Sequence, residues 1–259
     1  MKLGVAAAAA CLALASCDLP PPTATLDGPH ILRILPDPSA GPIDRWTTFR
    51  IEVDRRVAPE SVPQGVVAIT SGDTYAFVDI EIDVVHPALV VTPFDPLDPD
   101  VDYQLVVHSF RDLEGHASPD EMTPVVFHVG HRITPPVPST LTYADVAPTL
   151  VRCVPCHAGA DAAEGLDLSS PEGLLRTAVD VPSREVAPSV VGAHGAVVDA
   201  ALIGLRLIES QSASRSYLLY TMVGDEHIAG APMPPDALVS DDELVQMQTW
   251  IRAGVPGLR

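Results

Sequence analysis

The pentapeptide Cys153-Val154-Pro155-Cys156-His157 carries two thiols and an imidazole in the C-x-x-C-H spacing that is typical of c-type haem attachment. Two thiols three residues apart can each add to one vinyl group of the same porphyrin, and the adjacent imidazole can bind the iron as its proximal ligand. The motif therefore predicts one covalent haem c on Cys153 and Cys156, with His157 as an axial ligand of the iron.

Two other interpretations of these cysteines are open. A C-x-x-C pair can be a redox dithiol, which is expected at a helix N-terminus within a βαβ unit, and the sequence around Cys153 has no such pattern. The pair could also be half of a zinc site. Structural zinc takes four protein ligands, however, and the sequence has no second C-x-x-C and no H-x3-5-H. The haem interpretation accounts for His157 as well as for both thiols.

The sixth iron position needs a second ligand, for which we predict Met233. Met233 lies in the loop Ala-Pro-Met-Pro-Pro (231–235), where the flanking prolines present its thioether from a stiff segment. Met222 and Met247 fall in apolar patterns and are more simply core residues. The alternatives to Met233 are His227, His194 and an open position.

Residues 1–16 are typical of an export signal peptide, in which Lys2 supplies the positive charge and the following apolar run is too short to span a bilayer as a mature helix. The run ends in Leu-Ala-Ser-Cys, which resembles a bacterial lipobox. That resemblance implies lipidation of Cys17 and an exported lipoprotein of the cell envelope, periplasmic or associated with the outer membrane. Residues 17–28 are Pro-rich and have no periodic apolar pattern, which predicts a solvated tether.

Composition limits the partners of this chain. Its 259 residues carry a formal net charge of −19, so nucleic acids and anionic lipid headgroups are poor electrostatic partners. A redox protein with a basic surface would match this acidic surface and is the expected partner. Contact with the membrane is expected through the lipid alone. The 27 prolines favour strands, turns and extended linkers over a helical bundle.

Short alternating or apolar runs between residues 29 and 130 predict an antiparallel sandwich of about seven strands, with no helix of useful length. The expected strands are 30–35, 47–53, 66–70, 75–83, 89–92, 103–108 and 125–129. Asp79, Glu81 and Asp83 alternate along one of these runs. We expect them on a solvated strand face and not in a calcium loop, which would crowd its oxygens into a tight turn.

Three helices are expected after an extended Pro-rich linker over 131–141. The first covers 142–151, with Pro148 inside it, and a short second helix lies near 171–177. The last begins at the capping box formed by Ser240 and Glu243. Its predicted buried face is Leu244, Met247, Trp250 and Ile251.

Two parts of the chain resemble known families. FRIEVDRRVAPESV (49–62) and the segment 90–117 resemble bacterial Ig-like domains, although His116 stands where that family usually has Asn. CVPCHAG, GLDLSS, SYLLYTMVG and PMPPDALVSDDELVQMQTWIRAGV together resemble the small c-type cytochrome domain of bacterial envelope proteins. The resemblances imply a multi-domain chain, with an all-β Ig-like sandwich (29–130) followed by an all-α cytochrome c-like domain (142–259).

The sequence thus predicts a membrane-anchored monohaem c-type cytochrome lipoprotein that transfers electrons in the bacterial cell envelope. We expect an electron carrier and not an enzyme, because no set of nucleophile, base and orienting group is found apart from the haem motif. The alternatives are a haem enzyme or gas sensor with an open sixth iron position, and a surface-binding Ig-like lipoprotein.

Overall fold

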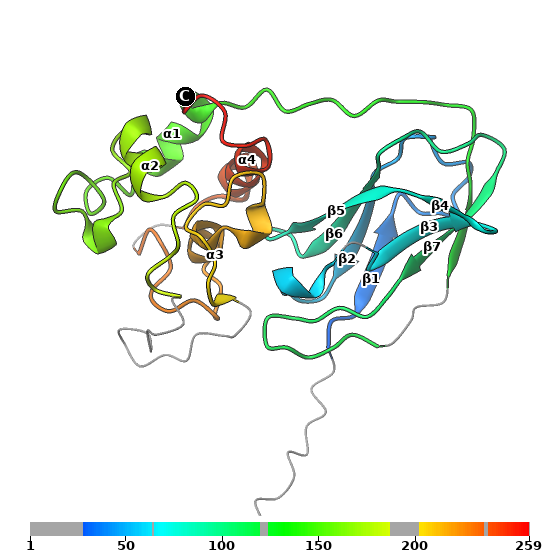
Figure 1. The fold of residues 1–259 in the computed structure, drawn as a ribbon, viewed down its shortest axis with the longest axis horizontal. Coiled ribbons are helices and arrows are strands. Elements are labelled where there is room, and N and C mark those ends of the chain that lie inside the picture. Colours follow the sequence, from blue (N-terminus) through cyan, green and yellow to red (C-terminus); the bar gives the residue numbers. More distant parts are fainter. Residues whose placement is uncertain (1–27, 64, 120–123, 187–201, 236–237, 259) are drawn as a thin grey trace, which may run out of the picture.

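A computed structural model describes residues 28–63, 65–119, 124–186, 202–235 and 238–258. The strands are β1 (Ile31–Leu35), β2 (Phe49–Val53), β3 (Val67–Ser71), β4 (Thr74–Ala76), β5 (Val78–Asp83), β6 (Ala88–Pro93), β7 (Asp102–Val107) and β8 (Val125–His128). The helices are α1 (Tyr143–Val151), α2 (Pro171–Thr177), α3 (Tyr217–Val223) and α4 (Asp241–Arg252). The strands form a β-sheet part (28–130), and the helices form a helical part (141–258) beside it (Figure 1). Within these described ranges, no helix is long and apolar enough to cross a membrane.

The β-sheet part consists of two antiparallel four-stranded sheets. Their strand orders are β1-β2-β6-β5 and β4-β3-β7-β8. Each predicted run contains a strand, but the run 75–83 holds two, because the chain leaves one sheet and enters the other at Phe77. β4 pairs with β3, whereas β5 pairs with β6 along its whole length. One predicted run of alternating residues therefore supplies an edge strand to each sheet.

The two sheets enclose a core of apolar side chains. Phe49, Ile51 and Val53 are buried on alternate positions of β2, as the period of two predicts. The ring of Phe49 lies 4.9 Å, centroid to centroid, from that of Phe127 in the opposite sheet. Phe127 also stacks on Tyr103 at 5.9 Å. Burying each such ring contributes about 2 kcal/mol, so this contact between sheets is a main stabilising element of the β-sheet part.

The last helix forms as the sequence predicts. The Ser240 side chain accepts from the Glu243 N–H, and the Glu243 carboxylate accepts from the Ser240 N–H at 3.0 Å, which completes the capping box. Gly254, with φ of +85°, then turns the chain away from the helix axis. The predicted buried face of Leu244, Met247, Trp250 and Ile251 is confirmed.

The predicted fold class, an all-β Ig-like sandwich followed by an all-α cytochrome c-like domain, is wrong. The chain is mainly β with a few helices, and its helical part is not an all-α domain. Helices α1 to α4 have only 9, 7, 7 and 12 residues. Between α2 and α3 the backbone instead forms bridges that pair Val179 with Ile208 and Pro182 with Arg206. In the described part of this stretch, Pro182 has no N–H to donate to a helix and Gly204 adopts a φ of +81°, which favours extended and turn segments over a helix.

The linker between the two parts is extended, as predicted. Residues 131–140 contain no helix or strand, are exposed, and arch over one side of the molecule in Figure 1. Its first residues are fixed by Asp44, whose carboxylate accepts from Arg132 Nε at 2.9 Å and from the Thr134 hydroxyl at 2.7 Å. Burial favours the neutral form of Asp44, but these hydrogen bonds and those from backbone N–H groups outweigh it and lower its pKa to about 2.

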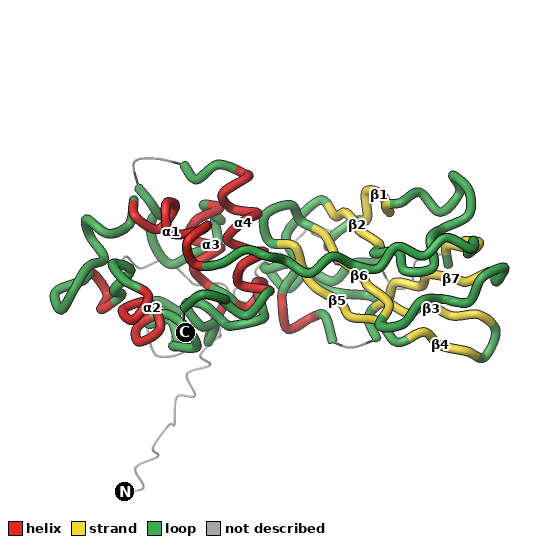
Figure 2. The backbone as a smooth tube through the Cα atoms, turned by 90° about the horizontal axis from the view of Figure 1, so that it is seen from above, coloured by secondary structure: helices red, strands yellow, loops and turns green. Residues whose placement is uncertain are grey.

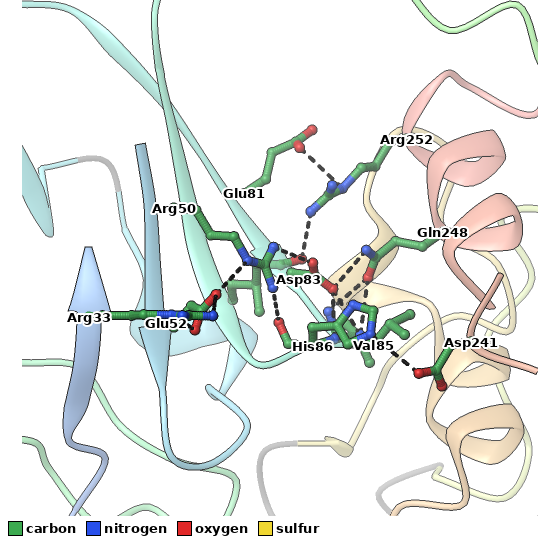
Figure 3. A network of polar contacts seen from close by, with 12 residues as sticks. Arg33, Arg50, Glu52, Glu81, Asp83, Val85, His86, Asp241, Gln248 and Arg252 are labelled. Carbon is green, nitrogen blue, oxygen red and sulfur yellow. Dashed lines mark hydrogen bonds and ion pairs between the residues drawn. The ribbon is translucent and has the colours of Figure 1, made fainter. Parts of the chain in front are cut away.

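The two parts contact each other directly through the end of β5 and one face of α4 (Figure 3). Gln248 of α4 is buried, and its Nε2 donates to Asp83 Oδ1 at 2.9 Å while its Oε1 accepts from the Val84 N–H at 2.8 Å. Arg252 adds an ion pair to Glu81 at 3.1 Å. The prediction of a solvated face for this part of β5 is therefore wrong for Glu81 and Asp83.

Apolar contacts cover the same interface. Ala58, Val84, Val85 and Leu113 of the β-sheet part belong to the hydrophobic core of the helical part. Figures 1 and 2 agree that α3 and α4 lie on the side facing the sheets, with α2 on the far side. The interface thus fixes α4, and with it the segments that α4 packs against, relative to the β-sheet part.

Candidate functional site

The CVPCH segment forms a tight turn directly after α1. The Cys153 N–H donates to the Leu150 carbonyl at 2.9 Å, and the N–H groups of Cys156 and His157 both donate to the Cys153 carbonyl, at 3.2 and 2.9 Å. These hydrogen bonds continue the helix by one loose turn. As a result, the backbone places both thiols and the imidazole on one short segment.

The two thiols have different surroundings. Cys153 is partly buried against the hydrophobic core, whereas Cys156 is exposed, and both are free of disulfide bonds. Burial raises the pKa of the Cys153 thiol. A redox dithiol needs the opposite shift and a position at a helix N-terminus, but Cys153 follows the C-terminal end of α1. The surroundings of Cys153 are therefore unlike those of a redox dithiol.

His157 is held in a defined ring orientation. Its Nδ1 lies 3.1 Å from the Ala163 carbonyl oxygen, and a carbonyl can only accept, so Nδ1 carries the proton. Two backbone hydrogen bonds close the loop around it, from Ala163 N–H to the Cys156 carbonyl and from Leu168 N–H to the His157 carbonyl. Metal-binding histidines commonly donate one ring N–H to a carbonyl or carboxylate, as Nδ1 of His157 does to Ala163. This contact leaves Nε2 as the nitrogen able to bind iron.

Met233 is partly exposed and is anchored through its backbone. Its N–H donates to the Thr221 carbonyl of α3 at 2.9 Å, which ties the Pro-rich loop to that helix. Met222 and Met247 are 3% and 0% exposed, and their prediction as core residues is confirmed. His227 contacts Asp225 and Glu114. The predicted lipidation residue Cys17 and the alternative ligand His194 lie outside the described residues.

Glu185 and Tyr217 lie near the motif, and sequence reasoning did not find them. Burial raises the pKa of Glu185, the carboxylate of Glu164 raises it further, and Tyr217 and His157 act in the opposite direction. The Tyr217 hydroxyl accepts from the Ala229 N–H at 2.9 Å, and burial is the main cause that raises the pKa of Tyr217 to about 12. No motif or spacing marks Glu185, which reaches this position through the bridges around residue 182.

A cavity of about 430 Å³ opens elsewhere in the helical part. It is lined by residues near Asp180 and Gln211 and by the C-terminal segment 254–258. None of the four predicted haem-binding residues lines it. This cavity is therefore not formed by the predicted haem-binding residues.

The donor set fits haem c by its chemistry. Two free thiols at the required spacing, one of them exposed, could form the thioether bonds, and His157 presents Nε2. In the described part of the chain, the cysteines are not members of the metal-ligand group found by geometry, which consists of Asp112, Glu114 and His116.

No protein-family model matches the chain, and no curated protein matches it. Among solved structures, the N-terminal part of the bacterial S-layer protein SbsC is 19% identical, with a TM-score of 0.32, over 43% of this chain and 25% of that one. The S-layer protein rSbsC(31-844) is 19% identical, with a TM-score of 0.32, over 43% and 14%. Domains 1–6 of surface layer protein SbsC are 18% identical, with a TM-score of 0.29, over 43% and 14%. The chain spans a quarter or less of these proteins, and matches at such TM-scores carry no argument about function.

Proposed function

We propose that this chain is a monohaem c-type electron carrier, held at the cell envelope by lipid on Cys17. The observation that carries the proposal is the CVPCH turn, in which two free thiols accompany an imidazole whose Nδ1 faces a carbonyl. Haem c, when bound, supplies an iron that accepts and releases one electron. The surrounding residues need only hold it, exclude water and present a surface to a partner.

Four residues would hold the cofactor. Cys153 and Cys156 would fix the porphyrin through thioether bonds, and His157 would bind the iron through Nε2. Met233 would supply the second protein ligand of the iron, since its loop is anchored on α3 and its side chain is partly exposed. A histidine and methionine pair generally raises the reduction potential of the haem, which suits a carrier in an oxidising compartment.

Two exposed apolar side chains lie close in sequence to the predicted haem-binding residues, which supports an apolar ligand beside these segments. Val151, at the end of α1, is 62% exposed, and Leu238, between the Met233 loop and α4, is 85% exposed. Each lies within five residues of a predicted haem-binding residue in the sequence. An apolar macrocycle beside these segments would remove such side chains from water, each at a gain of about 1–2 kcal/mol.

The partner we propose is a redox protein with a basic surface. The chain carries 34 acidic and 15 Lys and Arg residues, so encounter with a positively charged partner is favoured over long range. Electron transfer to such a partner should therefore slow as the salt concentration rises.

Substitution of Met233 tests the electron-carrier assignment. In the haem-loaded protein, Met233→Ala should lower the reduction potential by on the order of 0.1 V and allow carbon monoxide to bind the reduced iron, because the thioether ligand is lost. Potentiometry and absorption spectra with and without carbon monoxide measure both effects.

Met222→Leu is the matched control, because it replaces a buried methionine by an apolar residue of similar volume and should change neither property. If wild type already binds carbon monoxide and Met233→Ala leaves the potential unchanged, the sixth position is open, and a haem enzyme or gas sensor is the better assignment.

A further inference from the structure

Imidazole and carboxylate side chains gather where the β-sheet part meets the helical part. Asp112, Glu114 and His116 belong to the tight turn between β7 and β8, which is closed by the Asp112 N–H donating to the His116 carbonyl at 3.1 Å. Their ligand atoms all lie within 4.8 Å of one another. Leu113, between them, is 1% exposed and packs into the core of the helical part. The turn is thus fixed against the neighbouring part of the molecule.

His227 reaches the same group from the loop that follows α3. Its Nε2 lies 3.6 Å from Glu114 Oε1, and its Nδ1 lies 2.6 Å from Asp225 Oδ1. Asp225 is buried and also accepts from Arg56 Nη1 at 2.7 Å, so its position is well determined. Metal-binding histidines usually donate their other ring N–H to a carboxylate or carbonyl. Asp225 therefore orients His227 so that Nε2 faces the turn.

Within the turn, the imidazole of His116 lies at separations from both carboxylates that are close to those around a tetrahedral ion, and Glu114 directs its other oxygen toward His227. His116 Nδ1 lies 3.1 Å from Glu114 Oε2 and 3.3 Å from Asp112 Oδ2. Ligand atoms at about 2.0–2.1 Å from zinc in a tetrahedron lie about 3.3 Å from one another. Two imidazole nitrogens with two carboxylates suit zinc and its first-row neighbours, whereas calcium and magnesium prefer oxygen ligands alone.

The charges at the site also favour a cation. The proposed ligands and the orienting residue Asp225 contain three carboxylates, those of Asp112, Glu114 and Asp225. Two guanidinium groups contact them, Arg55 at 3.3 Å from Asp112 and Arg56 at 2.7 Å from Asp225. Counted over these carboxylates and guanidinium groups, the site has one excess negative charge. Arg55 also contacts Asp54 at 3.5 Å, so it retains a partner when an ion takes the Asp112 oxygen.

We propose that Asp112, Glu114, His116 and His227 bind one divalent transition-metal ion of the zinc class. Because His227 belongs to the helical part and the other three belong to the β-sheet part, the ion would join the two parts and fix their relative orientation. This site shares no ligand with the CVPCH turn and does not depend on haem.

Zinc titration of the full-length chain tests the site. Cys153→Ser/Cys156→Ser is the background, so that the thiols of haem-free protein cannot take the metal. Calorimetry should show one zinc ion per chain, and His116→Ala and His227→Ala should each weaken binding by about tenfold or more through loss of a ligand. Cobalt(II) should give the intense visible absorption of tetrahedral coordination, and zinc should raise the melting temperature of the background protein.

His128→Ala is the matched control. It removes another imidazole that contacts a carboxylate, Asp102 at 2.8 Å, and should leave zinc affinity unchanged. His227→Gln provides a second test should the alanine variant fold poorly. The proposal is overturned if zinc does not bind one to one in the micromolar range, or if either His227 variant binds zinc as tightly as the His128→Ala control.

Discussion

Replacing Asp83 by alanine is expected to lower the free energy of unfolding by about 3 kcal/mol. The substitution removes a buried carboxylate at the interface and leaves its hydrogen-bond donors without that acceptor. Asp83 accepts from Arg50 Nη1 at 2.6 Å, from the His86 N–H at 3.0 Å and from Gln248 Nε2 at 2.9 Å. The loss of the last contact also weakens the connection between β5 and α4. Urea unfolding followed by circular dichroism measures the change.

The same carboxylate makes stability depend on pH. Burial alone would raise the pKa of Asp83, but hydrogen bonds from His86, Gln248 and Arg50 outweigh it, and the pKa lies below its ordinary value. The stabilisation is therefore present above pH of about 4 and is lost as the pH falls through the folded-state pKa. Asp83→Ala should flatten the stability profile in this acid range.

Asp79→Ala is the control for this prediction, since Asp79 lies on the same strand but is only partly buried. It should cost less than about 0.5 kcal/mol. If the two alanine variants lose equal stability, the interface network does not contribute as the structure indicates.

Trp250→Ala is expected to cost about 3–5 kcal/mol, because Trp250 is the largest fully buried side chain among the described residues. Trp250 is 0% exposed and lies on the buried face of α4 between Met247 and Ile251. Removing the indole leaves a cavity that a helix fixed at both its cap and its interface cannot close. Thermal and urea unfolding measure the loss.

Trp250→Phe separates packing from hydrogen bonding. It keeps an aromatic ring but loses the bond from Trp250 Nε1 to the Pro256 carbonyl at 3.0 Å, and should cost about 1–2 kcal/mol. Trp46 stays in both variants as a fluorescent reporter of the β-sheet part. A loss below about 1 kcal/mol for the alanine variant would mean that α4 is not central to the core.

Local patterns were sufficient for some elements of this fold. The strand at Phe49 follows from alternation, and α4 follows from a capping box and one apolar face, because both depend on residues a few positions apart. The all-α prediction for the C-terminal part is wrong because a local pattern cannot show which extended segments pair. The bridge between Val179 and Ile208 joins residues far apart in the sequence.

The interface was equally inaccessible from sequence. Asp83 and Gln248 are 165 residues apart, and each looks like an ordinary surface residue of its own element. Alternation predicts that Asp83 lies on the face of β5 that points away from the sheet core, and this is correct. The prediction that this face is solvated is wrong, because α4 covers it in the folded chain. For the candidate site, the motif identified Cys153, Cys156 and His157, whereas Glu185 carries no signal in the sequence.

The most direct test of the proposed function is mass spectrometry of the chain after expression with the cytochrome c maturation machinery. The account predicts that the peptide containing residues 153–157 carries the mass of one haem, and that Cys153→Ser/Cys156→Ser removes it. A matured wild-type peptide without porphyrin mass would contradict the electron-carrier proposal, whatever the stability of the two parts.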